Sequence, residues 1–264
     1  MAYTTIDDPS AYFQTVLYSG NGSTQSITND GNSDLQPDWL WFKNRNDTQV
    51  HQLFDTNRGI ANSLRSNGTD AENTDDPNDR LTAINSDGFS LGDDGNPNNG
   101  SNTYVCWQWK ANGGTRTTFT ESSNNPGGGH QANTTGGFSI VKYKGNGTAG
   151  HTIPHHLGTT PNLILVKNLS STQSWLTGMT VLGWTKNLHL NETGAVETAT
   201  SIWNDTAPTS SVFTVGTNSK GNTNDDDYVA YCYAEKKGYS KFGLYKGNSS
   251  LMGTSYHAPM IYTG

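Results

Sequence analysis

The chain has 264 residues, a net charge of −7, 31% hydrophobic residues and only 15% charged residues. A negative balance without clustered Lys and Arg argues against a phosphate-binding surface for nucleic acid. No stretch approaches the roughly 18 apolar residues of a membrane span, and residues 1–5 are neither basic nor apolar. We therefore expect no nucleic-acid partner, no membrane insertion and no export by the usual signal.

The first predicted elements are strands. In residues 13–18, the side chains of Phe13, Thr15 and Leu17 alternate with those of Gln14, Val16 and Tyr18, as on the two faces of a strand. Gly20 and Gly22 predict a turn directly after them. Residues 39–42 form a continuous apolar run of strand length. Such a run predicts a strand that is covered on both faces.

The chain then repeats itself at a constant offset. Residues 37–44 match 161–168 (161 − 37 = 124), and residues 88–92 match 212–216 at the same offset. One offset kept from residue 37 to about residue 111 indicates duplicated modules rather than shared composition. The sequence predicts a first module over 1–111 and a second over 137–235.

The two copies help to interpret ambiguous segments. Alone, residues 59–66 resemble a short helix, but their counterpart 183–190 carries Trp184, Leu188 and Leu190 among residues that favour strands. We therefore predict a strand in both copies.

The last predicted strand of each module is residues 104–109 or 228–233. Alternation places the bulkiest side chains of each strand on one face. In the first copy these side chains are Val105, Trp107 and Trp109, and in the second they are Val229, Tyr231 and Tyr233. We expect this bulky face to be the core of each module.

The remaining segments connect or follow the modules. Residues 112–136 predict a linker rich in Gly, Ser, Thr and Asn, in which 115–120 are suited to an edge strand. Residues 236–264 predict the start of a third, truncated repeat, because 245–250 resemble 18–23 and 143–148. The predicted fold class is all-β, with two tandem antiparallel β-sandwich or jelly-roll modules.

The two cysteines do not occupy equivalent positions. Cys106 corresponds to Ala230, and Cys232 corresponds to Gln108, at the offset of 124. We therefore expect two unpaired thiols and no structural disulfide.

Metal ligands are sparse in the sequence. His151 and His155 have helical zinc spacing, but Pro154 and a strand context argue against a shared metal. Structural calcium is the remaining cofactor hypothesis, because acidic loops supply oxygen ligands. The calcium candidates are Asp93, Asp94, Asp225, Asp226 and Asp227. Such loops also form turns with their own backbone, so no other cofactor is predicted.

No catalytic grouping is present. The acidic residues cluster in loops rather than alternating along a strand, as a sandwich glycosidase would require, and no Gly-x-Ser-x-Gly turn occurs. We predict no catalytic residues and no enzyme activity. Sugar binding remains a hypothesis, for which Trp175, Trp203 and Tyr256 are the candidate stacking residues if they are exposed.

Several segments of the second copy form a recognisable pattern: residues 138–148, 151–155, 157–161, 201–205 and 228–235. In the first copy the pattern includes Phe54, Asp55, Arg58, Gly59 and residues 87–89. With these segments the chain resembles a repeat of virion proteins from marine tailed bacteriophages. This resemblance implies a tail-fibre or structural protein with a lectin-like sandwich and no catalytic residues. His156 departs from the family, which commonly has Gly there.

Two functional hypotheses follow. The first is a non-enzymatic phage virion protein, such as a tail fibre, appendage or surface decoration, that adheres to a host-surface glycan. This protein would be made in the host cytoplasm and would assemble with other virion proteins. It would also form a homo-oligomer, and a trimer is the specific hypothesis. The alternative is a carbohydrate-active enzyme or a secreted cellular lectin with a concanavalin-like sandwich.

Overall fold

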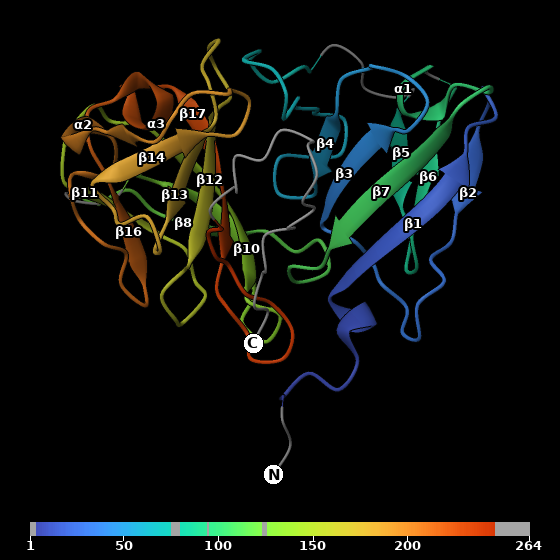
Figure 1. Cartoon of the computed structure of the whole chain (residues 1–264), viewed down its shortest axis with the longest axis horizontal. Helices are drawn as coiled ribbons and strands as arrows, with labels where there is room; N and C mark the ends of the chain where they lie inside the picture. The colour runs from blue at the N-terminus through green and yellow to red at the C-terminus, as the bar shows by residue number, and fades with distance from the viewer. Residues whose placement is uncertain (1–3, 75–79, 94, 123–125, 246–264) are drawn as a thin grey trace, which may run out of the picture.

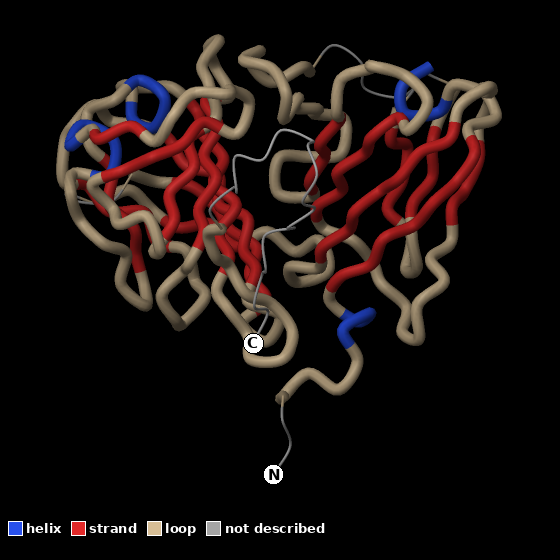
Figure 2. Tube along the Cα trace, viewed as in Figure 1, coloured by secondary structure: helices blue, strands red, loops and turns tan. Residues whose placement is uncertain are grey.

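The computed structural model describes residues 4–74, 80–93, 95–122 and 126–245. The predicted all-β fold is confirmed: antiparallel sheets account for nearly all regular structure (Figures 1 and 2). Helical segments are limited to short turns: η1 (Pro9–Ala11), α1 (Gly95–Asn98), α2 (Thr200–Trp203) and α3 (Ser219–Asn222). In the described ranges, none of the helices has the length and apolar character that crossing a membrane requires.

The first module contains two sheets. A four-stranded sheet has the order β1-β7-β3-β4, with β1 (Phe13–Ser19), β7 (Thr103–Trp109), β3 (Trp39–Asn44) and β4 (Gln52–Asp55). A three-stranded sheet has the order β2-β6-β5, with β2 (Gln25–Ile27), β6 (Phe89–Leu91) and β5 (Leu81–Ile84). Leu40, Phe42 and Tyr104 of the larger sheet share a core cluster with Phe89 and Leu91 of the smaller one. This pair of layers is a small sandwich.

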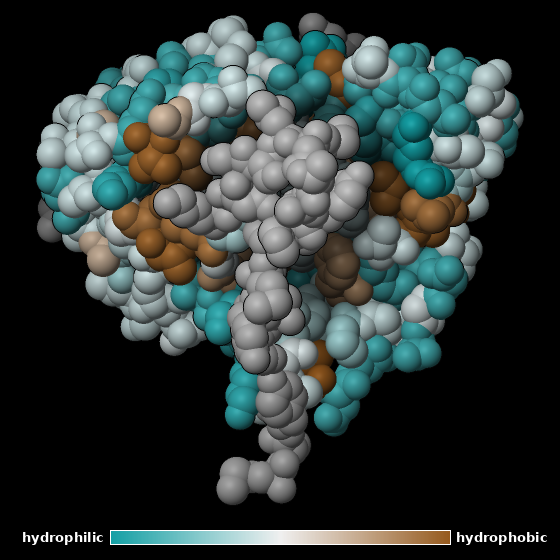
Figure 3. All heavy atoms as spheres, viewed as in Figure 1, coloured by the Kyte–Doolittle hydropathy of each residue, from teal (hydrophilic) through white to brown (hydrophobic). Residues whose placement is uncertain are grey.

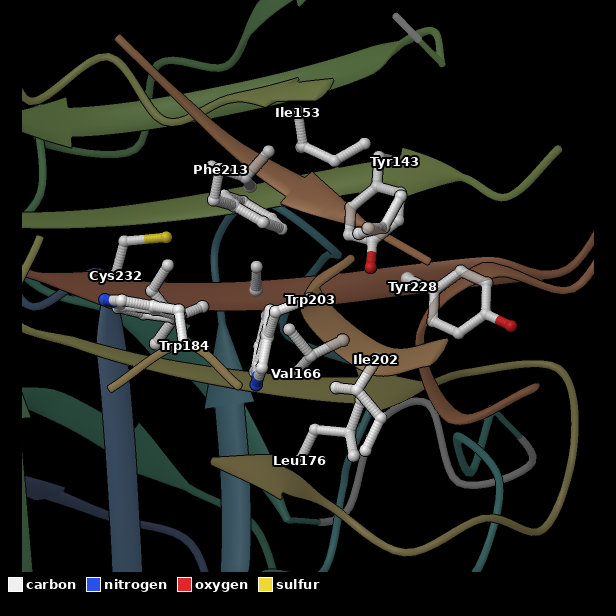
Figure 4. Packing of buried hydrophobic residues seen from close by; sticks show 14 of the residues in the cluster. Tyr143, Ile153, Val166, Leu176, Trp184, Ile202, Trp203, Phe213, Tyr228 and Cys232 are labelled. Carbon is white, nitrogen blue, oxygen red and sulfur yellow. The ribbon is translucent and has the colours of Figure 1, made fainter. Parts of the chain in front are cut away.

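The second module repeats this plan around a larger sheet. Its eight strands have the order β15-β14-β13-β12-β17-β10-β9-β8. Their bounds are β15 (Glu197–Thr198), β14 (Lys186–His189), β13 (Leu176–Met179), β12 (Leu163–Asn168), β17 (Asp227–Tyr233), β10 (Phe138–Lys144), β9 (Gly128–Asn133) and β8 (Thr117–Phe119). A two-stranded sheet of β11 (His151–Pro154) and β16 (Val212–Val215) covers it through Ile153 and Phe213 (Figure 4).

The two copies match in three dimensions as well as in sequence. The order β1-β7-β3-β4 corresponds to β10-β17-β12-β13. At the offset of 124, buried Asn98 and Asn222 hold the same position after β6 and β16. The Asn98 Nδ2 donates to the carbonyls of Gly92 and Ser23 at 2.6 and 2.7 Å. The Asn222 Nδ2 donates to the carbonyls of Gly216 and Thr148 at 2.7 and 2.9 Å.

The central strands are covered on both faces, as the apolar runs predicted. On β3, Leu40 and Phe42 face the core of the first module, whereas Trp39 and Trp41 face the second module. The expectation that the bulky face of β7 and β17 is each module's own core is wrong. Val229 and Tyr231 lie in the cluster between the modules. The opposite face of each strand, which carries Tyr104 and Cys106 on β7 and Tyr228 and Cys232 on β17, lines the core of its own module. The modules therefore pack face to face.

Two predicted segments differ from expectation. The linker 112–136 contains the predicted edge strand, β8, but it also contains β9, which pairs along the whole of β10 from Asn133↔Phe138 to Gly128↔Tyr143. This part is therefore sheet rather than linker. The strand predicted for 183–190 exists as β14, whereas its counterpart in the first module forms only isolated bridges at Leu64 and Ser63. Residues 236–245 contain a bridged turn, and the rest of the predicted third repeat lies outside the described residues.

Candidate functional site: an aromatic groove between the modules

The two modules meet through stacked aromatic rings. Trp39 of β3 is fully buried, and its ring centroid lies 4.3 Å from that of Tyr231 on β17, with 20° between the planes. Trp109 lies 4.5 Å from Trp39, and Phe138 lies 5.7 Å away. Burying an aromatic side chain of this size is worth about 1.5–3 kcal/mol by area alone. The contact therefore makes a substantial contribution to joining the modules.

A buried ionic network lies beside these rings. The Arg58 guanidinium donates to Asp55 Oδ2 at 2.5 Å and to Glu72 Oε1 at 2.6 Å. The Tyr231 hydroxyl from the second module donates to Asp55 Oδ2 at 2.6 Å. Burial disfavours the charged Arg58, but Asp55, with Tyr231 and Glu72, outweighs that effect and raises the pKa of Arg58. The charge is thus paired, as a buried charge must be.

Further hydrogen bonds join the loop after β4 to the second module. Asn57 Nδ2 donates to the carbonyls of Gly129 and Ile140 at 3.0 and 3.1 Å. The indole of Trp175 donates to the carbonyl of Arg65 at 2.9 Å. These contacts tie a first-module loop to strands β9, β10 and the start of β13.

Lys167 of β12 is a buried cation in the same interface. Its Nζ donates to the carbonyl of Asn168 at 2.8 Å and to that of Thr69 in the other module at 3.3 Å. Burial lowers the pKa of Lys167 to about 8, against the opposing attraction of Asp70.

Beside this closed part, the two large sheets leave an open groove of about 570 Å³. Its size is within the range of small-molecule sites. Figure 3 shows hydrophobic residues exposed on both sides of the middle of the face seen in Figure 1. The groove is lined by Phe13, Trp41, Trp109, Gly136, Gly137, Phe138, Leu163, Leu165, Thr177, Met179, Leu190, Tyr233, Tyr239, Ser240, Lys241 and Phe242.

The chemistry of the groove is apolar with a few polar groups. Trp41, Trp109 and Tyr233 are half-buried, so part of each ring is accessible. Lys241 is the only charged side chain on the described part of the wall. Thr177 Oγ1 is buried without a hydrogen-bond partner in the described part of the chain. Such a site suits a ligand with flat apolar faces and a hydroxyl or carbonyl group.

The aromatic residues predicted to bind sugar are not those that line the groove. The expected exposure of Trp175 and Trp203 is wrong: they are 0% and 1% exposed. Trp203 packs between Trp184, at 5.3 Å, and Phe213, at 6.4 Å, inside the second module (Figure 4). Both indoles fill sheet-to-sheet space and present no face to a ligand. Tyr256 lies outside the described residues.

Sequence reasoning missed Trp41, Trp109 and Tyr233 as accessible residues. They alternate with buried residues on central strands, which is the pattern of a core face. One signal in the sequence could have distinguished these residues from ordinary core residues. The central strands of each module carry bulky apolar side chains on both faces, whereas a simple sandwich needs them on one face only. The second such face predicts packing between modules.

The calcium candidates in the loop before β17 are engaged with donors. Asp226 Oδ2 accepts from Asn168 Nδ2 at 2.8 Å and from Ser171 Oγ at 3.3 Å. Asp227 pairs with Lys142 at 3.5 Å and with Lys144 at 3.3 Å. Asp225, which has a φ of 65°, and Asp93 are exposed. Asp94 lies outside the described residues. The described residues contain no cluster of three metal-binding side chains, and structural calcium stays a prediction.

The histidines of the second module are dispersed. His151 contacts Asn146, and the Nδ1 of buried His155 accepts from the Leu157 backbone N–H at 3.2 Å. His156 instead stacks on His130 of β9, with ring centroids 3.3 Å apart and planes 8° apart. Burial, with the neighbouring His156, lowers the pKa of His130 to about 4. This pair holds β9 against the loop after β11.

Both thiols are free and fully buried. Burial raises the pKa of Cys106 well above its ordinary value and that of Cys232 to about 12. Protonated, inaccessible thiols are poor nucleophiles. The cysteines therefore act as small apolar core residues.

One protein family matches residues 8–264, and its description is a domain of unknown function (DUF7483). The chain belongs to this family. The match spans both modules. No curated protein and no solved structure matches the chain.

Proposed function

We propose that this DUF7483 protein is a non-enzymatic structural component of a phage virion, such as a tail fibre, appendage or surface decoration. The observation that carries the proposal is the buried interface through which two copies of one module pack as a single unit, centred on the Trp39–Tyr231 stack. A repeated module whose bulkiest residues pack against a neighbouring copy is suited to assemblies built from many such units. The sequence resemblance to phage virion proteins supplies the biological setting.

The arrangement of the carboxylates supports a non-enzymatic role. Asp55 is buried in the network with Arg58 and Tyr231. Asp38 accepts from the backbone N–H groups of Ala111 and Gly113 and from Thr56 Oγ1. The described wall of the groove carries no Asp or Glu that could act as a general acid. These carboxylates are used to hold loops and modules together.

We propose adhesion to a host-surface glycan as the function of the groove. The accessible rings of Trp41, Trp109 and Tyr233 offer stacking surfaces for sugar rings, and Lys241 and Ser240 offer polar contacts at the rim. The second candidate, a carbohydrate-active enzyme or a secreted cellular lectin, is favoured by the same groove. Its enzyme form requires a carboxylate pair beside the bound sugar.

Mass spectrometry of purified virions tests the structural role. We expect the protein to be present in particles at a fixed stoichiometry with other virion proteins, and its absence from washed particles would refute the proposal.

A glycan array tests adhesion separately. Trp109→Ala, which truncates an accessible ring of the groove, should abolish binding. Trp184→Phe, which changes the core of the second module outside the groove, should leave binding intact. Release of reducing ends by the pure protein would favour the enzyme instead.

A further inference from the structure

The edge of the first module's large sheet differs from the matching edge in the second module. In the second module, β10 pairs with β17 on one side and with β9 on the other. Among the described residues, β1 of the first module pairs with β7 only and is the terminal strand of its sheet. The same structural position is therefore covered in one copy and open in the other.

The hydrogen-bond pattern identifies the open backbone groups. The Lys110 N–H donates to the Tyr12 carbonyl at 3.0 Å, and the Gly20 N–H donates to the Asn102 carbonyl at 2.9 Å. Even-numbered residues of β1 therefore bond to β7, since antiparallel pairs alternate. Phe13, Thr15 and Leu17 direct their backbone N–H and C=O away from β7. Within the described ranges, these groups have no hydrogen-bond partner.

The side chains on β1 lack the usual protection of an edge strand. Edge strands are normally short, or carry Lys, Pro or a bulge that blocks further pairing. β1 has seven residues, no charge, no Pro and a regular register with β7. Leu17 is 60% exposed. At the other edge of the same sheet, β4 has four residues and is bridged at Leu53↔Leu64.

We propose that β1 is a self-association edge, which pairs antiparallel with β1 of a second copy of this chain. In the two-fold register, Thr15 lies opposite Thr15, and Phe13 lies opposite Leu17 of the partner copy. An uncharged strand suits this arrangement because a two-fold axis would place any central charge against itself. The result is one continuous eight-stranded sheet across two first modules. This inference does not depend on a virion role.

Sedimentation velocity over a wide concentration range tests the pairing. We expect a species of twice the 28.5 kDa monomer mass. Thr15→Lys should convert it to monomer, because the two-fold axis would place the two lysines directly opposite each other on an exposed face of the paired strands. Leu244→Lys is the matched control, since Leu244 is 56% exposed outside any strand, and it should keep the dimer. A wild-type monomer at all concentrations, or a dimer unaffected by Thr15→Lys, would overturn the proposal.

A cysteine cross-link tests the register without depending on that charge. Hydrogen-bonded antiparallel partners have Cα atoms about 5.5 Å apart, which a disulfide can span. Thr15→Cys should therefore form a covalent dimer under mild oxidation, whereas Ser19→Cys, four residues from the axis, should not. Cys106 and Cys232 are buried and do not compete. Equal cross-linking of both variants, or none with Thr15→Cys, would refute the two-fold pairing.

Discussion

The ring of Trp39 stacks on the ring of Tyr231, with 4.3 Å between the centroids and 20° between the planes, although the two residues come from different modules. The equivalent positions, at the offset of 124, are Leu163 for Trp39 and Trp107 for Tyr231. The two copies therefore carry different residues at each of these positions. The pair formed by Trp39 of the first copy and Tyr231 of the second lies at the centre of the interface.

Trp39→Ala should lower the free energy of unfolding by about 3–5 kcal/mol, because it opens a cavity in a fully buried aromatic cluster. Denaturant titration followed by circular dichroism measures the loss. The control is Trp107→Ala, at the position equivalent to Tyr231, where the side chain is only half-buried. Equal losses for the two variants would contradict a central role for Trp39.

Tyr231→Phe keeps the stacked ring but removes the hydroxyl that donates to Asp55 at 2.6 Å. A hydrogen bond to a buried charged group is worth about 1.5–3 kcal/mol, and the variant should lose stability by that amount. Tyr233→Phe is the matched control, since the Tyr233 hydroxyl has no hydrogen-bond partner among the described residues. If both variants unfold at the same denaturant concentration as the wild type, the hydrogen bond from Tyr231 to Asp55 contributes nothing measurable to stability.

Asn98→Asp and Asn222→Asp should destabilise the protein by similar amounts. Each asparagine donates from Nδ2 to two backbone carbonyls in its own module, and a carboxylate would face those carbonyls without a donor. We expect a loss of about 2–4 kcal/mol for each. Asn224→Asp, at an exposed position, should change stability little. Thermal melting measures all three, and strongly unequal effects of the first two would show that the copies differ at this position.

Lys167 should make the protein gain stability as the pH rises from about 8 towards 10.5. The lowered pKa means that the unfolded chain binds more protons than the folded one in this window, so unfolding becomes less favourable. The gain is about 1–3 kcal/mol at most. Buried cysteines and tyrosines titrate in the opposite sense, so the comparison is the difference between wild type and Lys167→Met at pH 7.5 and pH 9.5. A difference that does not change with pH would rule out this titration.

His130→Phe should reduce the acid sensitivity of the protein. With a pKa of about 4, His130 stays neutral in the folded state while the unfolded histidine gains a proton near pH 6.5. Wild-type stability is therefore lost as the pH falls from about 6.5 to 4. The phenyl ring preserves stacking on His156 and cannot titrate. Melting temperatures at pH 7.5 and 5 measure the effect, and the drop between them should be smaller in the variant; an equal drop would exclude His130.

Much of the fold could be predicted because strand formation and duplication are local properties. The continuous apolar run at 39–42 and its copy at 163–166 identified the two-sided strands β3 and β12. Alternation identified which residues of β7 and β17 share a face. The strand β9 was missed because Gly128, Gly129 and polar neighbours carry no apolar alternation, and pairing with β10 holds them in place.

The two homologous all-β modules can be recognised from the order of the amino acids alone, since a constant offset and short-range periodicity need no long-range contacts to be seen. Which bulky faces meet each other depends on how the folded modules pack. Trp41, Trp109 and Tyr233 have the alternation of core residues, and only the packing of the two large sheets leaves them half-buried around a groove. Periodicity fixes the face on which a side chain lies, but what covers that face depends on packing between segments that are distant in the chain.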